Sequence, residues 1–298
     1  MRGLSPALVL TIAIVFGAAM DATIKYLTQT NPVLLVVLGR YLFGALFSAA
    51  LYLRAGSPPI SLAMWRAHLL RGVFIAATAS AFFWSLTVLP LAEAVALSFV
   101  YPLIVPFAAA LLIGERVRAT SLIAAGVGFA GVVVAAQGAP SAEETPLHAL
   151  GVAAVLFSAA AFAIAMVLLR QRAQKDGPVI VSLLSSVIPG MLIAAPAIVF
   201  SPPPHWPDWP IFLLMGALAA LFMYLLARAY AGAETQQLAP IHYTELVWAG
   251  LLGFLIFQEI PRVEIYAGAA LIIAACLYAA YDARRLAHLR DRMEQDGA

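Results

Sequence analysis

Apolar stretches long enough to cross a lipid bilayer occupy almost the whole of this 298-residue chain. A helix rises about 1.5 Å per residue, so a stretch of roughly 20 residues crosses the ~30 Å hydrocarbon core of a membrane. Backbone groups in lipid are satisfied only within helices or closed barrels, and the short alternating segments typical of barrel strands do not occur in this sequence. The sequence therefore predicts an all-α polytopic membrane protein with ten transmembrane helices, at 4–27, 32–53, 67–88, 90–112, 118–137, 147–170, 177–200, 209–231, 235–257 and 261–283.

The composition leaves no room for a soluble domain, because 63% of the residues are apolar and only 11% are charged. The single cysteine, Cys276, falls in the last predicted helix, which excludes a disulfide within one chain and a cysteine metal cluster. The sequence contains no phosphate-binding loop, no His-Glu-x-x-His zinc pair and no Gly-x-Ser-x-Gly nucleophile elbow. We therefore expect no enzymatic activity, no cofactor and no metal site, and we expect the functional groups to lie inside the helix bundle.

The basic residues predict the orientation, because cytoplasmic loops carry an excess of Lys and Arg. If the N-terminus is cytoplasmic and ten helices alternate, 14 of the 17 basic residues fall on the cytoplasmic side. The outer loop 138–146 then carries Glu143 and Glu144 and no basic residue. We expect a multi-pass protein of a bacterial-type inner membrane with both termini in the cytoplasm. The arginine-rich tail 284–298 is interpreted as an anchor to anionic lipid rather than as a nucleic-acid-binding arm.

Two sequence landmarks recur in the second half of the chain. Asn31-Pro32-Val33 opens the second predicted helix and Gly177-Pro178-Val179 opens the seventh, while Gly114-Glu115 closes the fourth and Gln258-Glu259 closes the ninth. Their separations of 146 and 144 residues agree on one repeat. Because each repeat has an odd number of spans, the two repeats must be inverted relative to each other, around a central cavity, as in many secondary transporters. The expected boundaries are 1–138 and 139–283 for the two five-helix repeats and 284–298 for the tail.

Further motifs follow one another in a fixed order. Ile24-Lys25-Tyr26-Leu27 precedes Asn31-Pro32 and Arg40-Tyr41-Leu42-Phe43, Tyr101-Pro102 leads on to Gly114-Glu115, and glycines follow at Gly126, Gly131 and Gly268. In this order and spacing, the motifs resemble the EamA group of the drug/metabolite transporter superfamily over nearly the full length of the chain.

This resemblance implies a secondary transporter that moves a small metabolite across the membrane by alternating access. It favours an amino acid as the substrate and export as the direction. The chain departs from the family pattern at Glu245-Leu246, where members commonly have Glu-Pro, and at Asp21, where many members have an uncharged residue. Uptake of a nucleotide-like or vitamin-like metabolite, which Asp21 ahead of Lys25 favours, remains an alternative, as does a channel or facilitator. The expected partners are a small-molecule substrate, the lipid bilayer and protons.

Charged residues within the predicted spans are the main candidates for function, because each costs at least ~2.5 kcal/mol to place in lipid. Asp21 and Lys25 lie one helical turn apart, so they form either an ion pair at the outer interface or a switchable pair that a zwitterionic substrate can invade. Arg40 lies about eight residues into its helix. Its planar fork suits a carboxylate, although it can equally serve as a structural partner of Asp21.

The ninth predicted helix carries the densest polar face, where His242 and Glu245 share a side and Trp248 follows. A buried carboxyl group or an imidazole there can carry a proton, or the face can serve only for packing. Aromatic residues in four helices predict an amphipathic cavity, with about a third of them lining it; they are Phe82, Phe83, Trp84, Phe157, Phe162, Tyr224 and Trp248. The complete set of predicted substrate-binding residues is Asp21, Lys25, Arg40, Trp84, Ser98, Tyr101, Phe162, Tyr224, His242, Glu245 and Trp248.

Overall fold

The computed structural model describes residues 6–114, 117, 119–137, 147–232, 242, 244–275, 277, 278 and 281, so the loop 138–146 and the tail 284–298 lie outside the described residues. Throughout the described ranges the regular structure is helical. The elements are α1 (Pro6–Leu27), α2 (Val33–Arg54), α3 (Leu62–Ser85), α4 (Leu91–Ser98), α5 (Tyr101–Ile113), α6 (Ala119–Gln137), α7 (His148–Asp176), α8 (Pro178–Phe200), η1 (Trp206–Asp208), α9 (Trp209–Gly232) and α11 (Glu245–Phe257). A further apolar helix covers Val263–Ala275.

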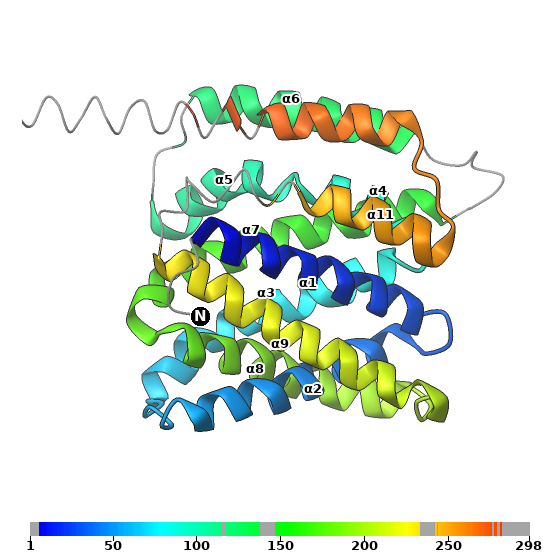
Figure 1. Cartoon of the computed structure of the whole chain (residues 1–298). Coiled ribbons are helices and arrows are strands. Elements are labelled where there is room, and N and C mark those ends of the chain that lie inside the picture. The colour runs from blue at the N-terminus through cyan, green and yellow to red at the C-terminus, as the bar shows by residue number, and fades with distance from the viewer. Residues whose placement is uncertain are drawn as a thin grey trace, which may run out of the picture.

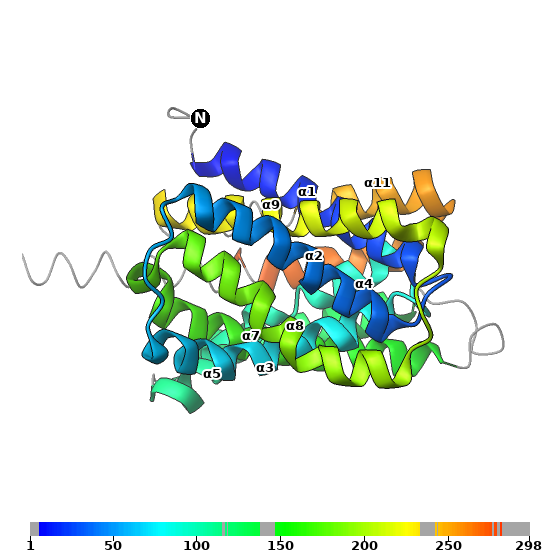
Figure 2. The same cartoon turned by 90° about the horizontal axis from the view of Figure 1, so that it is seen from below.

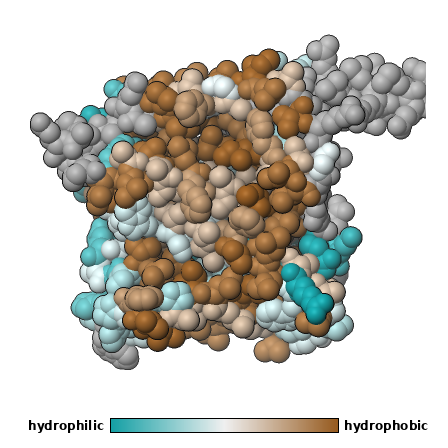
Figure 3. All heavy atoms as spheres, turned by 180° about the vertical axis from the view of Figure 1, so that it is seen from behind, coloured by the Kyte–Doolittle hydropathy of each residue, from teal (hydrophilic) through white to brown (hydrophobic). Residues whose placement is uncertain are grey.

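The prediction of an all-helical, multi-pass membrane protein is confirmed. Seven spans of the described chain are long and apolar enough to cross a membrane, and three shorter apolar helices, Leu122–Ala135, Glu245–Phe257 and Val263–Ala275, fall within the remaining predicted spans. Large apolar side chains cover much of the outer surface, which Figure 3 shows as broad brown areas on one face. Such a surface suits contact with lipid tails, because exposing so much apolar area to water is unfavourable.

Proline residues set several of the helix boundaries. Pro178 is the first residue of α8, and Pro32 and Pro90 directly precede α2 and α4. The fourth predicted span is divided at residues 99 and 100 into α4 and α5, and Pro102 lies in the first turn of α5, where its missing N–H is tolerated. Gly114 ends α5 with a φ of 70°, a left-handed conformation that favours glycine.

The helices of one half of the chain pack mainly against helices of the other half. Both views place α1 beside α9 and α11 (Figure 1, Figure 2). The contact of α1 with α9 is matched by that of α7 with α3, and the contact of α1 with α11 is matched by that of α7 with α5. Likewise, α2 contacts α9 while α8 contacts α3, and α2 and α8 contact each other. Exchanging the two halves therefore converts each of these contacts into one that is present, and the contact of α2 with α8 into itself.

Two glycines hold α6 against the helix Val263–Ala275, and these two helices lie side by side at one edge of the bundle (Figure 1). A Cβ atom on Gly131 would lie 2.8 Å from the carbonyl oxygen of Gly268, which is backbone and cannot easily move. Gly126, on the same helix, has open space around its Cα. The close approach of the two backbones therefore depends on Gly131 and Gly268, as in other small-residue helix contacts in membranes.

We expect Gly131→Ala to lower the melting temperature of the detergent-solubilised protein by several degrees, because the added methyl group forces the two helices apart. Gly126→Ala is the matched control and should leave the melting temperature unchanged or slightly raised, since alanine is the better helix former by ~1 kcal/mol. Equal melting temperatures for the two variants would show that this helix contact is not tight.

Candidate functional site

Three charged side chains from three helices come together inside the bundle. Asp21 of α1 is buried and lies within electrostatic reach of Arg40 of α2. Glu245, the first residue of α11, is half-buried and lies within electrostatic reach of Asp21. The packing of α1 on α11 brings the two carboxyl groups towards each other. Asp21 therefore interacts with both Arg40 and Glu245, and the network joins the first half of the chain to the second.

The guanidinium group of Arg40 rests on aromatic rings. Its Cζ atom lies 4.6 Å from the centre of the Tyr41 ring and 5.9 Å from the centre of the Phe83 ring. The planar cation is attracted to the ring faces, which orient it without filling its hydrogen-bond donors. The Nε atom of Arg40 is buried and has no hydrogen-bond partner within the described residues. An unfilled buried donor costs ~1–3 kcal/mol, so a ligand oxygen that filled it would gain affinity.

The remaining predicted site residues fall into separate groups. Tyr101 of α5 packs edge-on against Phe162 of α7, with ring centres 4.9 Å apart. Tyr224 and Trp248 are half-buried and pack on an apolar cluster formed by α1 and α9. The hydroxyl of Ser98 donates to the carbonyl of Val95 within its own helix, at 2.7 Å.

The other aromatic and polar residues considered for the site differ in their exposure. Trp84 and His242 are both half-buried, and Trp84 lies at the end of α3. Phe157, one of the aromatics considered for the cavity, is 59% exposed on α7 and so belongs to the outer surface. Of the two residues that contact the Arg40 guanidinium, Phe83 was among the aromatics considered for the cavity, and Tyr41 was not.

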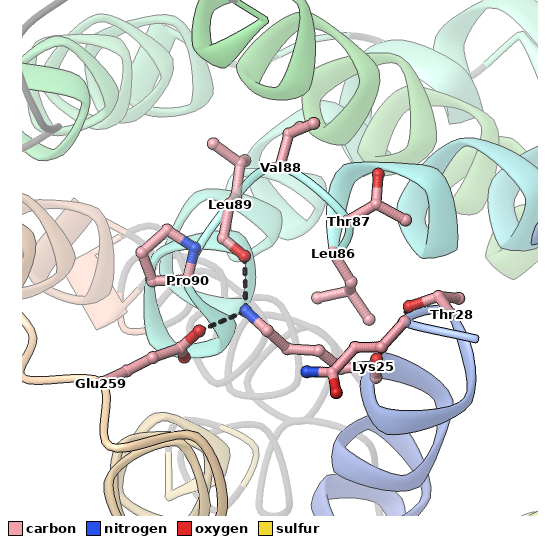
Figure 4. Close-up of a pocket in the computed structure, with 9 residues that line it drawn as sticks. Lys25, Thr28, Leu86, Thr87, Val88, Leu89, Pro90 and Glu259 are labelled. Atoms are coloured by element: carbon pink, nitrogen blue, oxygen red, sulfur yellow. Dashed lines mark hydrogen bonds and ion pairs between the residues drawn. The ribbon is translucent and has the colours of Figure 1, made fainter. Parts of the chain in front are cut away.

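Lys25 pairs with Glu259 instead of with Asp21. Its Nζ atom lies 2.5 Å from Oε1 of Glu259 and donates to the carbonyl of Leu89 at 2.7 Å, as Figure 4 shows. The other carboxylate oxygen of Glu259 accepts the backbone N–H of Leu91 at 2.9 Å, at the start of α4. Lys25 therefore ties the end of α1 to the α3–α4 connection and to the residues after α11. In the predicted orientation this is the outer end of the bundle.

A pocket of about 340 Å³ opens beside this ion pair. Its lining residues come from the end of α1, the α3–α4 connection and the segment after α11, and they are Lys25, Thr28, Gln29, Leu86, Thr87, Val88, Leu89, Pro90 and Glu259. Glu259 is one of the repeat landmarks in the sequence, but it lies 234 residues after Lys25, so no local spacing indicates that the two side chains pair.

A second polar cluster joins α3, α7 and α8 through their buried side chains. Nε2 of His68 lies 2.9 Å from Oδ2 of Asp176, which also accepts the Nε–H of Arg172 at 3.0 Å. Nη1 of Arg71 donates to the hydroxyl of Ser185 at 2.9 Å. In the predicted orientation this cluster lies towards the cytoplasm. The contact of His68 with Asp176 joins residues 108 positions apart, so no local motif in the sequence indicates it.

The connection between α1 and α2 is fixed by Asp208 of η1. Oδ2 of Asp208 accepts hydrogen bonds from the Thr30 hydroxyl at 2.7 Å and from the Asn31 amide at 2.8 Å. Burial of Asp208 raises its pKa, but these hydrogen bonds and the neighbouring His205 outweigh burial and leave the pKa below its ordinary value. The carboxylate therefore stabilises this connection at neutral pH, and the stabilisation is lost only as the pH falls through that lowered value.

The orientation can be tested by labelling single cysteines with an impermeant maleimide in intact cells, after Cys276→Ala removes the native thiol. His205→Cys, whose side chain is exposed in the α8–α9 connection, serves as the outer site, whereas the neighbouring Asp208 is buried. We expect His205→Cys to react in intact cells and Ala55→Cys, in the exposed α2–α3 connection, to react only after permeabilisation. The reverse pattern would overturn the predicted orientation.

Comparison with known proteins decides the family. The sequence model of the EamA-like transporter family matches residues 4–137 and again residues 149–281. The chain belongs to this family. It is therefore a transporter and not an enzyme, and the two matches indicate that the EamA unit is duplicated within the chain.

Several relatives of this EamA-family chain have a named substrate. It is 22% identical to an S-adenosylmethionine uptake transporter of Rickettsia bellii, over 92% of each chain. It is 28% identical to a riboflavin transporter of Rhizobium johnstonii, over 93% of this chain and 91% of that protein, and 26% identical to a riboflavin transporter of Brucella anthropi, over 84% and 89%. These relatives favour the alternative of vitamin-like or nucleotide-like uptake over the expected amino-acid export.

One crystal structure has the same fold. It superposes with a TM-score of 0.66 at 23% sequence identity and covers 94% of this chain and 97% of that chain. At this identity the likeness shows the fold alone.

Proposed function

We propose that this EamA-family protein is a secondary transporter that takes up a metabolite with a flat heterocyclic ring, of the nucleoside-like or flavin-like class. The observation that carries this proposal is the Arg40 guanidinium, which lies on two aromatic rings, keeps one donor unfilled and interacts with Asp21, which in turn interacts with Glu245. The names of the relatives supply the substrate class. Sites for small molecules combine apolar and aromatic walls with a few placed polar groups, and the surroundings of Arg40 have this composition.

Each group in this network has a chemical role that fits such a substrate. Arg40 can donate to a carboxylate or a ring carbonyl, because its fork offers two parallel N–H groups. Asp21 or Glu245 can accept from an ammonium or an amino group. The rings of Tyr41 and Phe83, which lie beside the Arg40 guanidinium, supply an aromatic wall for the heterocycle. In this proposal Asp21, Arg40 and Glu245 bind the substrate rather than only stabilise the fold.

We infer that transport proceeds by rocking of two inverted five-helix repeats, 1–138 and 139–283, about the central network. Two observations support this: the family model matches the chain twice, and exchanging the two halves preserves the pattern of helix contacts. Asp21, Arg40 and Glu245 come from both halves, so a relative movement of the halves changes their mutual distances. We further propose that protons drive uptake, since the network contains two carboxyl groups that can exchange a proton.

A ligand panel tests the substrate class. The purified protein is heated with S-adenosylmethionine, riboflavin, nucleosides or free amino acids, and the compounds that raise its melting temperature are then tested for flux into liposomes. A ligand present at 100 times its dissociation constant stabilises a protein by ~2.7 kcal/mol, which a melting curve resolves. We expect a ring-bearing metabolite to stabilise the protein and to enter liposomes with saturable kinetics. Stabilisation and flux with amino acids alone would contradict the proposal and favour the amino-acid alternative.

A further inference from the structure

A second acidic residue lies close to the Lys25–Glu259 pair but takes no part in it. Glu93 of α4 is fully buried, and its Oε1 atom lies 2.8 Å from Nε2 of His148, the first residue of α7. Its other oxygen, Oε2, is buried and has no hydrogen-bond partner in the described part of the chain. A buried carboxylate with one unfilled oxygen is costly, so this group is a candidate for exchanging a proton.

Glu93 and the Lys25–Glu259 pair form one electrostatic unit. Glu93 lies within electrostatic reach of both Lys25 and Glu259, and Glu259 also holds the backbone N–H of Leu91, two residues before Glu93. The ionisable groups that interact with Glu93 are therefore His148 from α7, Lys25 from α1 and Glu259 from the segment after α11. We call these four residues the outer cluster.

The charges of the outer cluster balance only when it holds one additional proton. With His148 neutral and both carboxylates ionised, Lys25 is the single positive charge against two negative charges, and the net charge is −1. A proton shared between Glu93 and His148 makes the cluster neutral. Because an unbalanced buried charge is unfavourable, the packed arrangement of α1, α4, α7 and Glu259 binds this proton more tightly than a separated, hydrated arrangement does.

We propose that the Glu93–His148 pair is a proton-binding site whose occupancy holds the outer end of the transporter closed. The proton reaches it from the outer solution through His148, whose side chain is 12% exposed while that of Glu93 is fully buried. By linkage, loss of the proton weakens the closed arrangement, and Lys25 and Glu259 separate more often. The inference rests on the proposed transport cycle but requires no particular substrate.

Cysteine labelling measures opening of the outer end without any substrate. Leu86 lines the pocket beside Lys25 and is 2% exposed, so Leu86→Cys should react with an impermeant maleimide only when the outer end opens. Thr87→Cys, at an exposed neighbouring position, reports how the thiol chemistry itself changes with pH. Both are made in a Cys276→Ala background. The quantity measured is the labelling rate of Leu86→Cys divided by that of Thr87→Cys.

We expect the rate ratio to rise several-fold as the external pH is raised from about 5.5 to about 8.5, because the outer cluster then loses its proton. With Glu93→Gln, which mimics the protonated carboxyl, the ratio should stay low at every pH. Glu264→Gln, which removes a carboxyl group outside the cluster, should keep the pH response of the parent protein. If Glu93→Gln does not fold, His148→Gln should reduce the response, since glutamine can donate to Glu93 but cannot titrate.

A ratio that does not depend on pH in the parent protein would overturn the proposal. An undiminished pH response in Glu93→Gln, or in His148→Gln where that variant is used, would overturn it as well. Failure of the ligand panel, in contrast, would affect only the proposed substrate class, because labelling is measured in the absence of any ligand.

Discussion

Arg40→Lys is expected to weaken substrate binding about ten- to a hundredfold while leaving the fold intact. The ammonium group of lysine cannot reproduce the two-point fork of arginine or its flat contact with the rings of Tyr41 and Phe83. A hydrogen bond to a charged group contributes ~1.5–3 kcal/mol, and each ~1.4 kcal/mol changes a dissociation constant tenfold. The measurement is the concentration dependence of initial uptake, with whichever metabolite stabilises the protein.

The matched control is Arg54→Lys, at the exposed far end of the same helix, which should transport normally. The melting temperature separates the two roles considered for Arg40. A purely structural arginine would give a large loss of melting temperature together with the loss of uptake. Normal uptake by Arg40→Lys would remove Arg40 from the binding site.

Glu259→Gln is expected to abolish most of the uptake and to lower the melting temperature. Removing one partner of a buried ion pair costs up to ~3–5 kcal/mol, and the cost here should be smaller because Glu259 retains some exposure to solvent. The variant leaves Lys25 without its carboxylate, so the outer end closes poorly and the transport cycle stalls. The measurement is initial uptake at saturating substrate together with a melting curve.

The exchanged pair, Lys25→Glu with Glu259→Lys, serves as the test of mechanism. It restores the ion pair but not the hydrogen bond from Lys25 to Leu89, so it should regain part of the melting temperature and of the uptake lost in Glu259→Gln. Equal uptake by the parent protein and by Glu259→Gln would show that this pair is not part of the outer closure.

Much of the fold could be predicted from the sequence, because the constraint that lipid imposes is local. Every span must satisfy its own backbone and present apolar side chains, so spans can be found from runs of residues alone. The fourth span was predicted as one helix, but it is divided just before Pro102, a residue that the sequence shows and that acts locally on the helix that contains it. Asp21, Arg40 and Glu245 could be selected because a charge within a span is expensive wherever its partner lies.

The partners of these charges could not be predicted, because they depend on contacts between distant helices. Sequence spacing suggested Asp21 for Lys25, but the end of α1 meets the segment after α11, and Glu259 takes that place. The contact of Glu93 with His148 depends in the same way on the packing of α4 against α7. The sequence repeat indicated that the two halves of the chain pack together, but it did not indicate which polar side chains contact each other.

The measurement that tests the account most directly is counterflow in liposomes loaded with unlabelled substrate. A trace of labelled substrate is added outside, with no gradient of pH or voltage, and its content in the liposomes is followed over time. If the two halves alternate about the site around Arg40, labelled substrate should accumulate transiently above its outside concentration, because each inward movement is paired with return of unlabelled substrate. Arg40→Lys should lose this overshoot. Equilibration of the label without any overshoot in the parent protein would contradict alternating access and indicate a channel.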